Sequence, residues 1–309
     1  MNKRRLSIAA ASLASLVLGA TATLPASGAA ATATQPSAAC RLALGSVDSV
    51  GGHTGQEITA GTPPTASAKH VTPIRFAPGV AKLSGSWISE PNIAGSDNYG
   101  KLVLGTSLYA GFYQTNELDK PTTLRKIGGG WDQFSFYEES RFDQSGRPGG
   151  TWHTYEYALR KDGVLARWRI GDKGQWIAAG TYAGFSSVKT MALISQTPSY
   201  DTFLANARGG ALYTIRIPLS SPLKPVVTKV RSSTWQGFET LIAERCGQHG
   251  TLLLGIDKET KTGFLYAVGR ASGTATVING LGKVPATFAD PVYFRNTVVA
   301  FASDPLNGD

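Results

Sequence analysis

The stretch Gly128-Gly129-Gly130-Trp131-Asp132-Gln133-Phe134 contains a pattern that returns at nearly fixed intervals along the chain. An aromatic residue followed three positions later by Phe occurs at Trp131/Phe134, Tyr182/Phe185 and Trp235/Phe238. The first aromatics (131, 182, 235) are therefore 51 and 53 residues apart, and further steps of 53 forward and 55 back reach Phe288 and Phe76. A period of this length is typical of repeat proteins, so the pattern predicts five units.

A second marker repeats in phase with the first. Leucines that lie within alternating apolar and polar runs occur at Leu108, Leu165, Leu212 and Leu265. Three of them lie 23 residues before the next aromatic (108 to 131, 212 to 235, 265 to 288). Each unit then contains four short runs with strand periodicity. The expected first strands are 134–137, 185–194 and 238–243, and the expected last strands are 123–127, 176–178, 225–230 and 275–278.

Composition agrees with an all-β fold. The 309 residues are 42% apolar and only 17% charged, which favours a globular chain with a sizeable core. The 36 glycines and 16 prolines favour many short strands joined by turns. Four strands in about 50 residues correspond to one blade of a β-propeller, and we expect the five-bladed propeller to span residues 74–309.

The first 33 residues have the features of a secretory signal peptide. Lys3, Arg4 and Arg5 precede an apolar run at 6–24, and small residues at 26–33 offer cleavage bonds at about 28–33. An uncleaved membrane anchor is the alternative. The signal predicts an extracellular protein with no membrane attachment after cleavage.

Charge gives little indication of a nucleic-acid partner. Removing three basic residues with the signal lowers the net charge from +9 to +6. The remaining lysines and arginines are scattered, whereas a nucleic-acid groove needs clustered cations. We therefore expect no nucleic-acid partner.

Cys40 and Cys246 are the two cysteines, and in an exported chain we expect them to form a disulfide. Two unpaired buried thiols are the alternative. No metal site is expected, because neither cysteine has a CxxC neighbour and His53, His70, His153 and His249 are far apart in sequence. The sequence also contains no cofactor motif, so we expect no cofactor.

Residues 34–73 form an N-terminal segment with two short apolar patches, 42–47 and 56–60, followed by a Pro-containing linker at 61–68. After Phe288 only 21 residues remain, enough for two strands at 291–294 and 297–302 but not for four. We expect the N-terminal patches to pair with these C-terminal strands and complete the last blade.

The string from Leu124 to Phe136 closely resembles the blade signature of tachylectin-type lectins, in which a Gly-Gly-Trp-Asp-x-Phe segment recurs. The resemblance implies a five-bladed propeller that binds N-acetylated amino sugars. At the other units the Gly-Gly and Asp are replaced, for example by Ala183 and Gln236 after the first aromatic. This departure leaves open one sugar site, a changed specificity, or no site.

The chemistry of saccharide binding agrees with the same segment. Gly129 and Gly130 allow the backbone to approach a ligand closely, Asp132 can accept hydrogen bonds from hydroxyls, and Trp131 can stack on a sugar face. The alternative for Trp131 is packing between sheets. We expect Gly129, Gly130, Trp131 and Asp132 to form the ligand site.

The sequence therefore predicts a secreted, monomeric, non-enzymatic carbohydrate-binding protein whose partners are glycans or cell-wall polysaccharide. One alternative is a protein-interaction scaffold with degenerate sugar sites. A glycan-active hydrolase is the other, with carboxylates from Glu138, Glu139 and Asp143, although neighbouring strand residues such as Glu138 and Glu139 point to opposite faces. No Gly-x-Ser-x-Gly, HExxH or P-loop motif is present.

Overall fold

The computed structural model describes residues 39–117, 120–146, 148, 150–298 and 305–309. They belong to one compact unit, Ala39–Asp309. The predicted signal peptide and its cleavage site lie outside the described residues. In the part of the chain that is described, no helix is long and apolar enough to cross a membrane.

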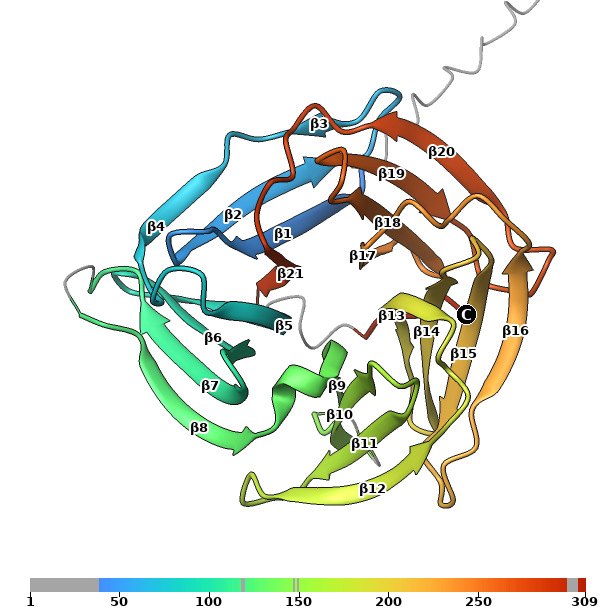
Figure 1. Ribbon diagram of the computed structural model, residues 1–309, viewed down its shortest axis with the longest axis horizontal. Coiled ribbons are helices and arrows are strands. Elements are labelled where there is room, and N and C mark those ends of the chain that lie inside the picture. Colours follow the sequence, from blue (N-terminus) through green and yellow to red (C-terminus); the bar gives the residue numbers. More distant parts are fainter. Residues whose placement is uncertain (1–38, 118–119, 147, 149, 299–304) are drawn as a thin grey trace, which may run out of the picture. The chain divides into compact units, whose positions relative to one another are not determined.

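The unit is all-β, as the sequence predicts, and repeated four-stranded antiparallel sheets build it (Figure 1). Three of the sheets contain four consecutive strands each. They are β9 (Phe134–Asp143), β10 (Trp152–Arg160), β11 (Leu165–Ile170) and β12 (Trp176–Tyr182); β13 (Val188–Gln196), β14 (Tyr200–Ala207), β15 (Leu212–Pro218) and β16 (Val226–Arg231); and β17 (Thr240–Cys246), β18 (Gly250–Asp257), β19 (Thr262–Val268) and β20 (Ile278–Lys283).

The other strands form one larger, nine-stranded sheet instead of two separate ones. Its members are β1 (Arg41–Val47), β2 (Gly52–Thr59), β3 (Thr65–Ala66), β4 (His70–Ile74), β5 (Ala81–Asn92), β6 (Gly95–Leu104), β7 (Ser107–Gln114), β8 (Thr123–Gly129) and β21 (Val292–Val298). β21 pairs antiparallel with β1 through residues 292–295 and parallel with β5 through residues 296–298. We expected five separate sheets, but the structure has four hydrogen-bonded sheets. The reason is that β21 pairs with both β1 and β5 and so joins two groups of strands into one sheet.

The same pairing joins the two expected C-terminal strands, 291–294 and 297–302, into one over the residues that the structure describes. β21 runs without interruption across the predicted turn at residues 295–296, because its partner changes from β1 to β5 there and the chain stays extended. Residues 299–302, the end of the second expected strand, lie outside the described residues.

Two smaller expectations are also wrong. The predicted linker at 61–68 contains β3, since the residues after Pro63-Pro64 have backbone N–H groups that can pair with β2. The last strand of the fourth unit begins at Ile278 and not at 275, because Ala275 lies in a turn where its N–H donates to the carbonyl oxygen of Ser272 (3.1 Å).

Each repeat marker has a packing role. The four leucines Leu108, Leu165, Leu212 and Leu265 are fully buried. The aromatics Phe76, Trp131, Trp235 and Phe288 are also buried, but Tyr182 is 40% exposed and Phe185 lies in the core instead. The two repeating markers in the sequence, the aromatics and the leucines, therefore correspond mostly to side chains that pack between successive sheets.

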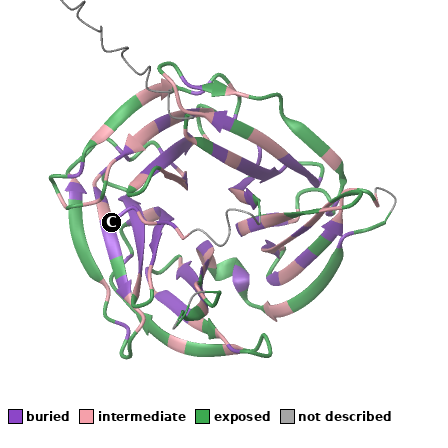
Figure 2. Cartoon of the chain, turned by 180° about the vertical axis from the view of Figure 1, so that it is seen from behind, coloured by how far each residue is buried: buried purple, intermediate pink, exposed green. Residues whose placement is uncertain are grey.

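The innermost strands of the unit surround a common centre (Figure 1). β5, β9, β13, β17 and β21 together line one small cavity of about 100 Å³. Burial decreases toward the outside, because the innermost strand β13 is almost wholly buried and the outermost strands β8 and β12 are mostly exposed (Figure 2). Apolar residues of neighbouring sheets fill the space between them.

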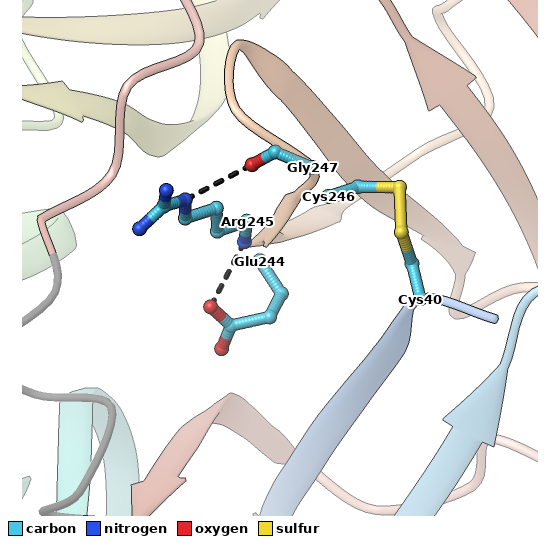
Figure 3. The surroundings of a disulfide bond; sticks show 5 residues. All are labelled: Cys40, Glu244, Arg245, Cys246 and Gly247. Carbon is cyan, nitrogen blue, oxygen red and sulfur yellow. Dashed lines mark hydrogen bonds between the residues drawn. A yellow bond between two sulfur atoms is a disulfide. The ribbon is translucent and has the colours of Figure 1, made fainter. Parts of the chain in front are cut away.

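Cys40 and Cys246 form the predicted disulfide (Figure 3). The bond joins residues that are 206 positions apart in sequence and whose Cα atoms are 5.3 Å apart. Cys40 directly precedes β1, and Cys246 is the last residue of β17. The disulfide therefore connects the N-terminal strands to the sheet of β17–β20.

Candidate functional site

A groove of about 330 Å³ lies between the face of the β5–β8 strands and β9. Strands β5 to β8 contribute a row of residues that are neighbours in the strand register, and β9 contributes Glu139 and Arg141. The lining side chains combine aromatic and apolar groups with cations and a carboxylate: Ser86, Ile88, Tyr99, Lys101, Ala110, Phe112, Thr123, Arg125, Glu139 and Arg141. Phe112 is 40% exposed. The groove thus offers both a flat apolar surface and fixed hydrogen-bonding groups.

The small side chain of Ala110 helps to keep the groove open. In the sheet of β9–β12 the equivalent position, two residues after the buried leucine, is Arg167. Arg167 is 2% exposed, and its guanidinium donates to the carbonyl oxygens of Pro218 (2.6 Å) and Ala179 (3.1 Å). The long side chain of Arg167 fills that space in the sheet of β9–β12, whereas the methyl group of Ala110 leaves it accessible beside β5–β8.

Trp87 supports the groove from behind. Its ring is fully buried and lies against the backbone of Gly100 on β6 and Gly111 on β7. A Cβ atom at Gly100 would lie 2.5 Å from the Trp87 ring, and one at Gly111 would lie 2.9 Å from it. Glycine at both positions therefore lets the indole pack directly on the strands that carry Tyr99, Lys101 and Phe112 on their other face.

A charged cluster forms the inner end of the groove. Lys101 donates to Glu139 and lies 2.9 Å from Oε1 of Glu156, while Nη2 of Arg141 lies 3.1 Å from Oε1 of Glu139. Glu139 and Glu156 are directly opposite each other on β9 and β10. Two carboxylates therefore share one partly buried ammonium group, which fixes the position of the Lys101 side chain.

The two carboxyl groups have opposite pKa shifts. Burial raises the pKa of Glu156, and the nearby Glu139 charge raises it further, against the attraction of Lys101. Burial alone would also raise the pKa of Glu139, but Lys101 and Arg141 outweigh it and lower that pKa. Glu156 also accepts a hydrogen bond from the Tyr137 hydroxyl (2.6 Å). The cluster consequently favours a state with one ionised carboxylate, that of Glu139.

These shifts predict that stability depends on the charge of Glu156. A carboxyl with a raised pKa in the folded state stabilises the protein below the ordinary glutamate pKa, and this contribution is lost as the pH rises through the raised value. Glu156→Gln mimics the protonated form. Between about pH 5 and about pH 8 we expect the free energy of unfolding of the variant to gain roughly 1 kcal/mol or more relative to the parent, because one pKa unit corresponds to about 1.4 kcal/mol.

Urea unfolding at both pH values measures this difference. Glu259→Gln is the matched control, since Glu259 is exposed and the same charge is removed. Its stability difference from the parent should not change with pH. Parallel pH curves for the parent and the Glu156→Gln variant would contradict the assignment of the raised pKa to Glu156.

The carboxylates of the hydrolase alternative lie in different places. Glu138 lines the central cavity, and its Oε1 accepts from the backbone N–H of Ser86 (2.9 Å). Glu139 lines the groove on the other face of β9, as strand alternation predicts. Asp143 ends the strand, and its Oδ1 accepts from Ser145. These three groups do not line one site.

The segment expected to bind sugar is a tight turn after β8. Gly129 ends that strand, Gly130 has a positive φ of 76°, and Trp131–Gln133 form the single-turn helix η1. A side chain at position 130 would be strained, which explains the glycine there. Asp132 is exposed and, among the residues that the structure describes, has no hydrogen-bond or ion-pair partner. None of these four residues lines the groove.

Trp131 lies in the core, which is the packing role left open by the sequence. Its ring is 6% exposed and packs against Phe134 (4.7 Å between ring centroids), Tyr137 (5.4 Å) and Trp168 (6.0 Å). The structure therefore separates the predicted residues into a buried Trp131 and an outward-facing Asp132.

Sequence reasoning missed the groove, because its residues belong to no repeated motif. A signal was nevertheless present: Tyr99/Lys101, Ala110/Phe112 and Thr123/Arg125 each have the two-residue spacing that places side chains on one face of a strand. Glycine or leucine separates the two members of each run, and among them the three runs contain two aromatic residues (Tyr99, Phe112) and two cations (Lys101, Arg125). Three such runs on neighbouring strands indicate one sheet face that carries both aromatic and cationic side chains.

The four histidines do not come together. His53 is buried, and burial followed by the nearby charge of Arg75 lowers its pKa to about 3. The Tyr113 hydroxyl and His53 Nδ1 are 2.8 Å apart. His249 Nδ1 is 3.0 Å from Nδ2 of Asn307. Within the described ranges, no group of three or more His, Cys, Asp or Glu side chains has the arrangement of a metal site.

No protein-family model and no curated protein sequence matches the chain. Solved structures with a similar arrangement include an α-L-arabinofuranosidase from Podospora anserina in complex with cellotriose, at 13% identity and a TM-score of 0.40 over 68% of this chain and 79% of that chain. A mutant of Aleuria aurantia lectin in complex with Fucα1-6GlcNAc has 12% identity and a TM-score of 0.42 over 78% of each chain.

Aleuria aurantia lectin is described as a six-bladed β-propeller. A complex of the fission yeast SREBP-SCAP binding domains is also similar, at 9% identity and a TM-score of 0.34 over 72% of each chain. These similarities are distant and involve the fold, and they are too weak to carry a ligand or an activity to this chain.

Proposed function

We propose that the protein is an exported, non-enzymatic carbohydrate-binding protein built on a five-bladed β-propeller. Five innermost strands around one cavity support the number of blades, and the pairing of β1 with β21 supports closure by the N-terminal strands. The basic and apolar residues at the N-terminus support export, and a disulfide is typical of an oxidising compartment.

The observation that carries the binding function is the groove between β5–β8 and β9. Saccharides present hydroxyl groups beside an apolar C–H face, so their sites combine an aromatic surface with few, well-fixed polar groups. The groove has both, because Phe112 and Tyr99 lie next to charged side chains that the Lys101 cluster holds in place. Its volume of about 330 Å³ is suited to one or two sugar rings.

The resemblance to tachylectin-type lectins supports a second, neighbouring location for a sugar. The exposed Asp132 after Gly130 is the group that would accept hydrogen bonds from hydroxyls there. N-acetylated amino sugars are the ligands that this resemblance implies. Glycans or cell-wall polysaccharide are the proposed physiological partners, and the proposed state of the protein is a monomer.

A glycan array with the purified protein tests the function, and two variants locate the site. We expect Phe112→Ala to weaken binding roughly 3- to 10-fold, because the aromatic contact contributes about 0.5–1.5 kcal/mol. Leu124→Ala is the matched control, since Leu124 is 39% exposed and lies on β8 but does not line the groove. If Asp132→Ala weakens binding and Phe112→Ala does not, the turn is the site. No binding to any glycan would contradict the proposed function.

A further inference from the structure

The groove between β5–β8 and β9 carries an excess of positive charge. Three cations line it, Lys101, Arg125 and Arg141, together with the carboxylate of Glu139. Glu156 does not line the groove but lies 2.9 Å from Lys101, so three cations face at most two carboxylates. Lys101 and Arg141 both interact with Glu139, so that carboxylate is already shared by two partners. The groove therefore has charge left over for a negatively charged ligand.

Arg125 is the cation that the protein leaves uncompensated. It is exposed on β8, and within the described residues it makes no ion pair and no side-chain hydrogen bond. Arg141 places one nitrogen on Glu139 and retains a side chain that is 42% exposed. A guanidinium group binds a carboxylate through two parallel hydrogen bonds, so a carboxylate is the group that Arg125 best recognises.

The groove next to this guanidinium is aromatic. On the paired strands β7 and β8, Phe112 is opposite Thr123 and Ala110 is opposite Arg125. The two pairs are two residues apart along each strand, so all four side chains lie on one face of the sheet. Tyr99 is opposite Phe112 on β6. A ligand that reaches Arg125 therefore passes over an aromatic surface, which is suited to the apolar face of a pyranose ring.

A second groove in the protein contains a cation at a different position of the sheet, and that cation is neutralised within the protein. It has a volume of about 580 Å³ and lies along β15 and β16 of the sheet β13–β16. There Arg216 is equivalent to Phe112, and Thr228 is equivalent to Arg125, since both sheets have a bulge after the buried leucine. Arg216 donates to Oδ2 of Asp309 (2.8 Å), so its charge is compensated within the protein.

We propose that the groove between β5–β8 and β9 binds a saccharide that carries a carboxylate, with Arg125 holding the carboxylate and Phe112 the sugar ring. Arg141 supplies additional donors from the opposite wall, and the short side chain of Ala110 provides the space. This inference rests on the proposed carbohydrate-binding function and specifies its ligand. Uronic acids and sialic acids share this chemistry.

Calorimetric titration with two pairs of probes tests the ligand class and distinguishes its sources. Oligoglucuronate is compared with the neutral gluco-oligosaccharide of equal length, and sialyllactose is compared with lactose. We expect at least one acidic probe to bind tenfold or more tightly than its neutral counterpart. The preference should decrease with added salt, because the ligand and Arg125 meet at the surface.

Arg125→Gln should weaken binding of the acidic probe roughly 10- to 100-fold, the range for a hydrogen bond between charged groups, and should leave the neutral probe unchanged. Lys126→Gln is the matched control, because Lys126 is the exposed neighbour of Arg125 on β8, carries the same charge and does not line the groove. Ala110→Trp should abolish binding of both probes by filling the groove. Thermal unfolding of each variant checks that the fold is retained.

Equal affinity for acidic and neutral probes, or equal effects of Arg125→Gln and Lys126→Gln, would overturn the carboxylate assignment and leave the carbohydrate-binding function standing. Binding that survives Ala110→Trp would overturn the location. If neither acidic nor neutral saccharides bind, the proposed function fails together with this inference.

Discussion

Deletion of residues 40–60 is expected to abolish the cooperative unfolding transition of the protein. These residues contain β1 and β2, and β1 lies between β2 and β21 in the large sheet. Leu42, Leu44 and Ile58 are at most 4% exposed and pack against the sheet of β17–β20. Burial of each such side chain contributes about 1.5–3 kcal/mol, while whole domains are stable by only about 5–15 kcal/mol.

Circular dichroism and differential scanning calorimetry of the deletion variant measure this effect. Ile58→Ala is the control for the loss of one contact, and it should lower the free energy of unfolding by about 2–5 kcal/mol while keeping a cooperative transition. A deletion variant that melts cooperatively at the temperature of the parent would show that residues 40–60 do not close the fold and are only a linker.

The double variant Cys40→Ala/Cys246→Ala should lose up to about 5 kcal/mol of stability. The disulfide joins residues that are 206 positions apart. In the chain-entropy model it lowers the conformational entropy of the unfolded state, which raises the free energy of unfolding. In the folded state, the bond ties the start of β1 to the end of β17. Urea unfolding at equal protein concentration gives the difference.

The reduced parent protein is the matched reference for the double variant. Both should have the same midpoint of unfolding, and a difference between them would point to a packing effect of the two alanines. If the double variant is within about 1 kcal/mol of the oxidised parent, the entropic argument is wrong for this chain.

The part of the fold that repeats could be predicted from the sequence. Leu108 and its counterparts are fully buried, and Trp131 and Trp235 lie in the core, so these packing positions recur at a nearly regular interval in the sequence. The pairing of Cys40 with Cys246 could be predicted because the chain has only these two cysteines. Local periodicity was sufficient for elements whose partners are their neighbours in sequence.

The pairing of patch 42–47 with a C-terminal strand could be predicted by counting the strands that the last unit lacks, but other features with distant partners could not be predicted from the sequence. The continuous strand β21 results from two partners, β1 and β5, and nothing local in residues 292–298 shows this. The groove exists because Ala110 has only a methyl group as its side chain. The importance of that small side chain becomes clear only from the structure, where Arg167 fills the equivalent space in the sheet of β9–β12. Periodicity reports which face a residue occupies but not how much room lies above it.

The pairing of β1 with β21 also affects how the protein is made. β1 is synthesised early, but its partner at residues 292–298 is separated from it by nearly the whole unit, so the edge of β1 stays unpaired until translation reaches that point. A chain that terminates before residue 292 keeps this exposed edge permanently. Incomplete translation products should therefore expose a strand edge that can pair with other chains.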